Sequence, residues 1–120
     1  MQRMPSHDED DTTNPESPAN LECSVEEVAA LLAAGTDFSF IDVRRDEEWA
    51  LAHIEGAELA NVEACLALPK ERLIVFTCHT GVRSLHAAKH FRDNGFVRAC
   101  SMAGGIEAWS LRVDSAVPLY

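Results

Sequence analysis

Apolar and polar positions along the chain follow two rhythms, which predict strands alternating with helices. Short, nearly continuous apolar runs rich in β-branched and aromatic residues predict strands at 38–43, 72–77 and 96–101, with a brief further strand at 57–59. This alternation is typical of an α/β domain with a mainly parallel sheet. Stretches with helical spacing or helix-end signals predict helices between Ser24 and Gly35, at 46–54, at 62–69, at 83–94 and from 104 onwards.

Three polar stretches lie at the ends of predicted strands. They are "DVR" at 42–44, "CHTGVR" at 78–83 and "MAGG" at 102–105. In open parallel sheets, ligands bind beyond the carboxyl ends of the strands. We therefore expect the three stretches to meet at one edge of the sheet, with Cys78 exposed there at the position where ligands bind.

The length of the chain suits one compact domain and not two, because 120 residues build a single core. Hydrophobic residues make up 47% of the chain, which is enough for that core. Residues 1–20 are rich in Asp, Glu, Pro, Ser, Thr and Asn and nearly free of large apolar side chains. We predict a disordered acidic tail at 1–20 and a folded domain at 21–120.

The charge of the chain excludes two classes of partner. A formal net charge of −10 argues against nucleic acid, which needs clustered Lys and Arg, and against anionic membrane surfaces. No apolar run approaches the roughly 20 residues of a membrane helix, and the first residues lack the apolar core of a signal peptide. We therefore expect a cytoplasmic protein. The four cysteines form no CxxC pair, so we expect neither a disulfide framework nor a metal site, and no cofactor.

The stretch "CHTGVRS" at 78–84 places a thiol between a buried strand and a helix. Loop N–H groups and a helix N-terminus together favour negative charge, and Gly81 allows the backbone to turn. Arg83 would add a fixed cation. A thiolate at Cys78 would be stabilised there and would be nucleophilic near neutral pH. The alternative is that Cys78 is only a small buried apolar residue.

Two further stretches accompany this loop in a fixed order. The stretch at 41–61, "IDVRRDEEWALAHIEGAELAN", and "MAGGIEAW" at 102–109 resemble, together with the loop, the three signatures of the rhodanese-like domain family. The resemblance covers residues 22–112. It implies a central, mainly parallel sheet of about five strands flanked by helices on both faces.

The resemblance also implies an activity. Sulfurtransferases of this family carry sulfane sulfur as a persulfide on the loop cysteine, which corresponds to Cys78. Thiosulfate or another persulfide would be the donor, and cyanide or a thiol the acceptor, which includes a possible acceptor protein. The loop residues that would surround the carried sulfur and bind substrate are His79, Thr80, Gly81, Val82, Arg83 and Ser84.

The length of the loop separates two chemistries among the relatives of this family. Six residues from Cys78 to Arg83 suit a sulfur atom, whereas seven suit a phosphate. Ala52 stands where the family usually has a glycine, a position that we expect to tolerate a methyl group. The chain stops soon after Pro118, so we expect little C-terminal structure over the site and an open site that favours a protein or a small thiol.

Asp42 and Arg44, at the end of the first long strand, are supporting residues in this interpretation. They either join a polar network near the loop or, as we favour, pair with Glu47 or Arg45 for structure. We expect His79 to face outward. We also expect structural roles for the other three cysteines, Cys23, Cys65 and Cys100, and packing roles for Trp49 and Trp109. His86 and His90, four residues apart, have a spacing that could bind a metal, but we expect them to lie on a solvated helix face.

Two other functions compete with the sulfurtransferase. One is a non-catalytic rhodanese-like module that docks partners, which the intact Cys78, Gly81 and Arg83 argue against. The other is a phosphatase or arsenate reductase, which the length of the loop disfavours. The sequence leaves the oligomeric state open.

Overall fold

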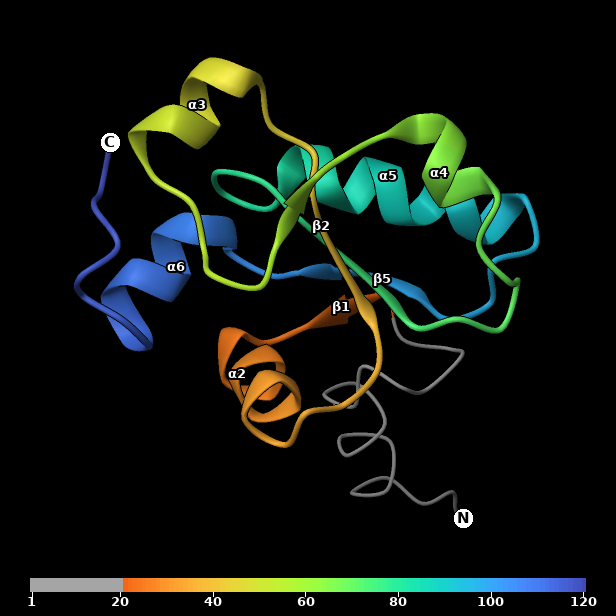
Figure 1. Ribbon diagram of the computed structural model, residues 1–120, viewed down its shortest axis with the longest axis horizontal. Coiled ribbons are helices and arrows are strands. Elements are labelled where there is room, and N and C mark those ends of the chain that lie inside the picture. The colour runs from red at the N-terminus through yellow and green to blue at the C-terminus, as the bar shows by residue number, and fades with distance from the viewer. Residues whose placement is uncertain (1–20) are drawn as a thin grey trace, which may run out of the picture.

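The protein is described here by a computed structural model, which covers residues 21–120; the tail predicted at 1–20 lies outside these described residues. Five strands form one sheet in the order β1-β5-β4-β2-β3, and every neighbouring pair is parallel (Figure 1). The strands are β1 (Glu22–Cys23), β2 (Ser39–Asp42), β3 (Glu58–Leu59), β4 (Ile74–Thr77) and β5 (Ala99–Met102). The helices are α2 (Val25–Ala33), α3 (Asp46–Leu51), α4 (Val62–Leu66), α5 (Val82–Asp93) and α6 (Gly105–Arg112).

Two apolar cores lie on opposite faces of the sheet, because successive residues of a strand point to opposite sides. Phe40 and Met102 pack with α2 and α6 on one face. Ile41 and Phe76 pack with α4 and α5 on the other. Figure 1 shows α2 and α6 on one side of the strands and α4 and α5 on the other. The α/β class, the parallel sheet and the helices on both faces are therefore as predicted.

Most elements are shorter than the sequence predicts, α5 is shifted by one residue at the same length, and the strand β1 was not predicted. The capping box of α2 is confirmed, with the Ser24 hydroxyl accepting from the N–H of Glu27 and the Glu27 carboxylate from the N–H of Ser24. The strand predicted at 96–101 is β5, which begins only at Ala99, since 97–98 form a turn. The strand β1 has two residues and no apolar run, so no pattern marked it.

The carboxyl ends of β2, β4 and β5 lie at the same edge of the sheet, because the three strands are parallel neighbours. Chain segments 42–44, 78–83 and 102–105 therefore meet there, as expected. Within residues 21–120, no helix has the length and apolar character needed to cross a membrane.

Candidate active site

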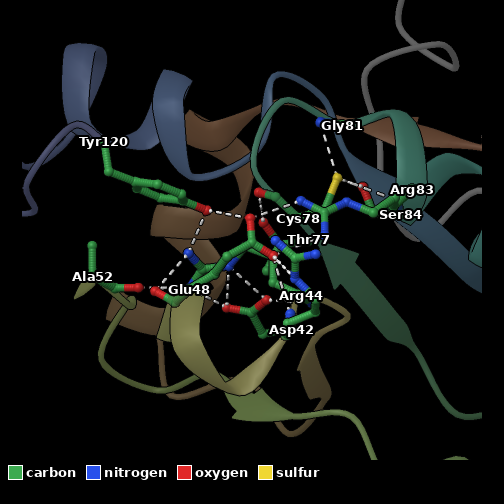
Figure 2. Close-up of polar contacts among 11 residues, drawn as sticks. Asp42, Arg44, Glu48, Ala52, Thr77, Cys78, Gly81, Arg83, Ser84 and Tyr120 are labelled. Atoms are coloured by element: carbon green, nitrogen blue, oxygen red, sulfur yellow. Dashed lines mark hydrogen bonds and ion pairs between the residues drawn. The ribbon is translucent and has the colours of Figure 1, made fainter. Parts of the chain in front are cut away.

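The sulfur of Cys78 lies at the end of β4, inside the loop that leads into α5 (Figure 2). The backbone N–H of Gly81 points at Sγ from 3.1 Å and that of Ser84 from 3.3 Å. The hydroxyl of Ser84 is 3.4 Å from Sγ and 2.7 Å from the hydroxyl of Ser101 on β5. A thiolate only accepts, so in that state Ser84 donates to Sγ and Ser101 can donate to Ser84.

These donors decide the protonation state of the thiol. Burial opposes ionisation of Cys78, yet the Ser84 hydroxyl and the N–H groups of Ser84, Gly81 and Arg83 together lower its pKa below the ordinary value of 9.0. Hydrogen bonds to the charged form outweigh the cost of desolvation here. A larger thiolate fraction at neutral pH follows, which is what a nucleophilic cysteine needs.

The loop keeps its shape because α6 begins against it. The N–H of Ile106 donates to the carbonyl of Cys78 at 2.8 Å, and that of Glu107 donates to the carbonyl of His79 at 3.1 Å. This approach requires Gly105, since a Cβ there would collide with both carbonyls. Gly81 has a φ of +102°, which favours glycine, and ends the loop as the N-cap of α5. Of the two glycines of "MAGG", Gly105 is thus explained by the loop that it braces, whereas Gly104 is the N-cap of α6 with a φ of +81°.

The guanidinium of Arg83 does not point at the thiol. Its two terminal nitrogens donate to the two carboxylate oxygens of Glu48 on α3, at 2.9 and 3.0 Å. The Arg83 guanidinium, opposed by burial, lowers the pKa of Glu48 to about 2. From the sequence we expected the positive charge of Arg83 to stabilise a thiolate at Cys78, but in the structure the Glu48 carboxylate neutralises that charge.

Asp42 and Arg44 pair with each other. The predicted pairing of these residues with Glu47 or Arg45 is therefore wrong. The Nη2 of Arg44 is 2.7 Å from Asp42 Oδ2, and neither side chain is more than 2% exposed. The same nitrogen donates to the carbonyl of Ala52 at 2.6 Å. Ala52 itself has an extended backbone with a φ of −165°, which any residue adopts, so a methyl group fits there. The pair ties the end of β2 to the chain that follows α3.

The C-terminal segment reaches the site, contrary to the expectation of an open site. The hydroxyl of Tyr120 accepts from Arg44 Nη1 at 2.7 Å and donates to Glu48 Oε2 at 3.1 Å (Figure 2). Its ring stacks on the imidazole of His79, with centroids 4.1 Å apart and planes 12° from parallel. His79 is therefore half-buried beneath Tyr120, and does not face outward as predicted.

Cys78 itself is only 1% exposed, whereas the sequence led us to expect an exposed thiol. The loop around it meets solvent, because Thr80, Val82 and Arg83 are exposed while Gly81 is buried. Access to Sγ therefore requires movement of the loop.

This chain resembles known proteins in both sequence and structure. Residues 24–112 match the family model described as "Rhodanese-like domain". The chain belongs to the rhodanese-like domain family. Among curated relatives, the chain is 36% identical over 95 residues to "Probable adenylyltransferase/sulfurtransferase MoeZ" of Mycobacterium tuberculosis. That match covers 74% of this chain and 24% of MoeZ, so this chain matches about a quarter of that longer protein.

Shorter proteins also match this rhodanese-like domain. "Putative sulfurtransferase YtwF" of Bacillus subtilis is 32% identical over 84 residues, which cover 65% of this chain and 79% of YtwF. Among solved structures, "Human Single Domain Sulfurtranferase TSTD1" has a TM-score of 0.66 at 28% identity and covers 77% of this chain and 96% of its own. A rhodanese-like domain protein from Staphylococcus aureus has the same TM-score at 25% identity, over 82% and 97% of the two chains.

Several residues of this rhodanese-like domain's site carry no pattern that identifies their role. Glu48 lies inside the first family signature, but its partner Arg83 is 35 residues away. Tyr120 lies outside all three signatures. Ser101 sits in a buried strand, where a serine has no distinctive spacing. Of the other residues considered, His86 and His90 are exposed on α5, and no cluster of three metal-ligating side chains occurs within 21–120.

Proposed function

We propose that this rhodanese-like domain is a sulfurtransferase that carries sulfane sulfur as a persulfide on Cys78. The observation that carries the proposal is the set of donors around Sγ, from Gly81 and Ser84, which favours a thiolate. The family and the relatives named as sulfurtransferases support sulfur transfer in general. A module that only docks partners has no need of a stabilised thiolate.

The reaction has two steps, and each is a displacement at the outer sulfur. The thiolate of Cys78 attacks the sulfane sulfur of thiosulfate, a bond from Sγ to that sulfur forms, and sulfite leaves with the electron pair of the broken S–S bond. Cyanide or a thiolate acceptor then attacks the same sulfur. The electron pair of the bond to Sγ returns to Cys78, which leaves as a thiolate ready for the next cycle.

The loop donors act in both steps. In the resting enzyme, the N–H groups of Gly81 and Ser84 stabilise the attacking thiolate. In the second step they stabilise the same thiolate as a leaving group, because negative charge returns to Sγ. The hydroxyl of Ser84 follows the charge, donating to sulfur when the charge is there.

Persulfide loading tests this function directly. The purified protein is incubated with thiosulfate or with methanethiosulfonate, and intact mass reports whether one sulfur atom is added; cyanide should then release thiocyanate and restore the mass. We expect loading in the wild type and none in Cys78→Ser. Loading from neither donor, or turnover of an aryl phosphate that matches sulfur transfer, would refute the proposal.

A further inference from the structure

Two ion pairs border the loop that holds Cys78. Arg83 pairs with Glu48, and Arg44 pairs with Asp42. A carboxylate therefore neutralises the positive charge of each of these two arginines. The fork of Arg83 is the natural docking group for the oxygens of a sulfonate, but both of its terminal nitrogens already donate to the Glu48 carboxylate.

Glu48 is fixed in this position by more than Arg83. Its carboxylate accepts from the N–H of Arg45 at 3.1 Å and from the hydroxyl of Tyr120 at 3.1 Å. The side chain is only 11% exposed, whereas that of Arg83 is 44% exposed. Tyr120 is in turn held by Arg44 and by its stack on His79. These contacts thus hold the Glu48 carboxylate against the guanidinium of Arg83.

A carboxylate held there affects donors according to their charge. An anion that replaces Glu48 at the two terminal nitrogens of Arg83 leaves a nearly buried carboxylate without its cation, which is costly. An anion that leaves Glu48 in place meets the neutral Arg83–Glu48 pair, and so loses the attraction that an unpaired Arg83 would exert. The lost attraction to Arg83, and the repulsion from a Glu48 carboxylate that has been displaced, both grow with the charge of the donor, so they act more strongly on a dianion than on a monoanion.

We propose that Glu48 is a positioning residue that sets donor specificity by neutralising Arg83, so that the site favours sulfane-sulfur donors of low negative charge over thiosulfate. Persulfides of thiols that carry little negative charge are the class that fits. Tyr120 contributes to the same effect, because its hydroxyl holds Glu48 against Arg83. This inference rests on the proposed sulfurtransferase function and concerns only the choice of donor.

Two donors with the same chemistry and different charge test it. Thiosulfate is a dianion, and methanethiosulfonate is a monoanion that gives up its outer sulfur to Cys78 with sulfinate as the leaving group. KM and kcat are measured for both, with cyanide as acceptor, in the wild type and in Glu48→Gln. Glutamine keeps the capping contact of α3 and removes the charge.

The expected result is a change in KM that depends on donor charge. In Glu48→Gln, KM for thiosulfate should fall about five- to tenfold and KM for methanethiosulfonate about two- to threefold, with kcat changing less, because the attraction scales with donor charge. Added salt should shrink the difference. Glu47→Gln is the matched control, since Glu47 lies on the same helix and is exposed; both of its KM values should stay within about twofold of wild type.

The outcomes separate this inference from the proposed function. Equal changes in the two KM values, or a rise in KM for thiosulfate, would overturn the role of Glu48 while sulfur transfer stands. If wild type accepts sulfur from neither donor, the proposed function fails instead. Should Glu48→Gln not fold, Tyr120→Phe decides: it keeps the ring on His79 and loses the bond to Glu48. A smaller shift of the KM ratio in the same direction supports the inference, and an unchanged ratio overturns it.

Discussion

Two sites of buried thiols, Cys78 and the pair Cys23 and Cys100, differ in the groups that surround the sulfur. Cys78 is 1% exposed in the loop after β4, while Cys23 and Cys100 are 3% and 0% exposed on the neighbouring strands β1 and β5. The pKa of Cys78 is lowered. That of Cys23 is raised by its hydrogen bond with Cys100, and by burial.

The difference comes from what surrounds each sulfur. Backbone N–H groups and a hydroxyl point at Cys78. Cys23 instead lies 3.7 Å from the sulfur of Cys100 and 3.6 Å from the carbonyl of Ser101, which accepts and cannot donate. A thiolate at Cys23 would face a carbonyl oxygen and a second thiol. The polarity of the neighbours, and not the depth of burial, therefore decides whether the pKa of a buried thiol is lowered, as at Cys78, or raised, as at Cys23.

Alkylation should show this contrast most strongly. With limiting iodoacetamide near neutral pH, we expect Cys78 to react at least about tenfold faster than Cys23 or Cys65, because the pKa of Cys78 is lowered and the pKa values of the other two are raised. We also expect movement of the surface loop to be enough to expose Cys78, whereas exposure of Cys23 or Cys100 needs separation of the paired strands β1 and β5. Peptide mass spectrometry on the native protein gives the rates. Faster labelling of Cys23 or Cys65 would contradict the comparison.

The donors around Cys78 depend on the close approach of α6, which one methyl group should break. Gly105→Ala places a Cβ against the carbonyls of Cys78 and His79 at a φ of +60°. We expect a loss of about 3 kcal/mol or more in the free energy of unfolding, together with slower labelling of Cys78. Gly35→Ala is the control, since its φ is +69° with nothing within 4 Å; it should cost only about 1–2 kcal/mol. Equal losses in urea unfolding would show that the backbone conformation alone matters.

The sequence predicts the fold and the position of Cys78 at the end of β4 well, because both depend on local patterns. The apolar run 72–77 marks β4, and the loop that follows it brings Cys78 and Gly81 to the carboxyl edge of the sheet. The strand β1 escapes prediction because Glu22 and Cys23 form no pattern of their own.

The charged surroundings of the site could not be predicted in the same way. Which carboxylate meets Arg83 depends on where α3 packs, and neighbouring Glu47 and Glu48 look alike in the sequence. Tyr120 is separated from its partner Arg44 by 76 residues. Contacts of this kind are set by tertiary packing, which leaves no spacing to recognise.

Removing one donor at Cys78 should have a moderate effect. Ser84→Ala deletes the hydroxyl beside Sγ and leaves the N–H groups of Gly81 and Ser84 in place. We expect the pKa of Cys78 to rise and its alkylation near neutral pH to slow by about three- to tenfold, since one of several hydrogen bonds is lost. Ser110→Ala removes another buried hydroxyl, which donates to the carbonyl of Val117. If both variants slow alkylation equally, the hydroxyl of Ser84 has no special role.

The smallest effect is a difference in how stability depends on pH. The pKa of Cys78 is lowered in the folded protein, so its contribution to stability is present above pH 9 and is lost as pH falls through the folded value. The pKa of Cys23 is raised, so its contribution is complete below pH 9 and is lost as pH rises further. The two thiols should therefore give opposite slopes.

Melting temperatures of the wild type, Cys78→Ala and Cys23→Ala, measured from pH 7 to pH 10.5, test these slopes. The gap between wild type and Cys78→Ala should widen towards pH 9, because only the wild type gains from the stabilised thiolate. The gap between wild type and Cys23→Ala should narrow above pH 9, because the unfolded wild type then ionises a thiol that the folded state keeps protonated. Each change should be on the order of a few °C. Since lysines and tyrosines titrate alike in all three proteins, the differences isolate the thiols. Two gaps that move in the same direction would mean that burial, after all, governs both sites.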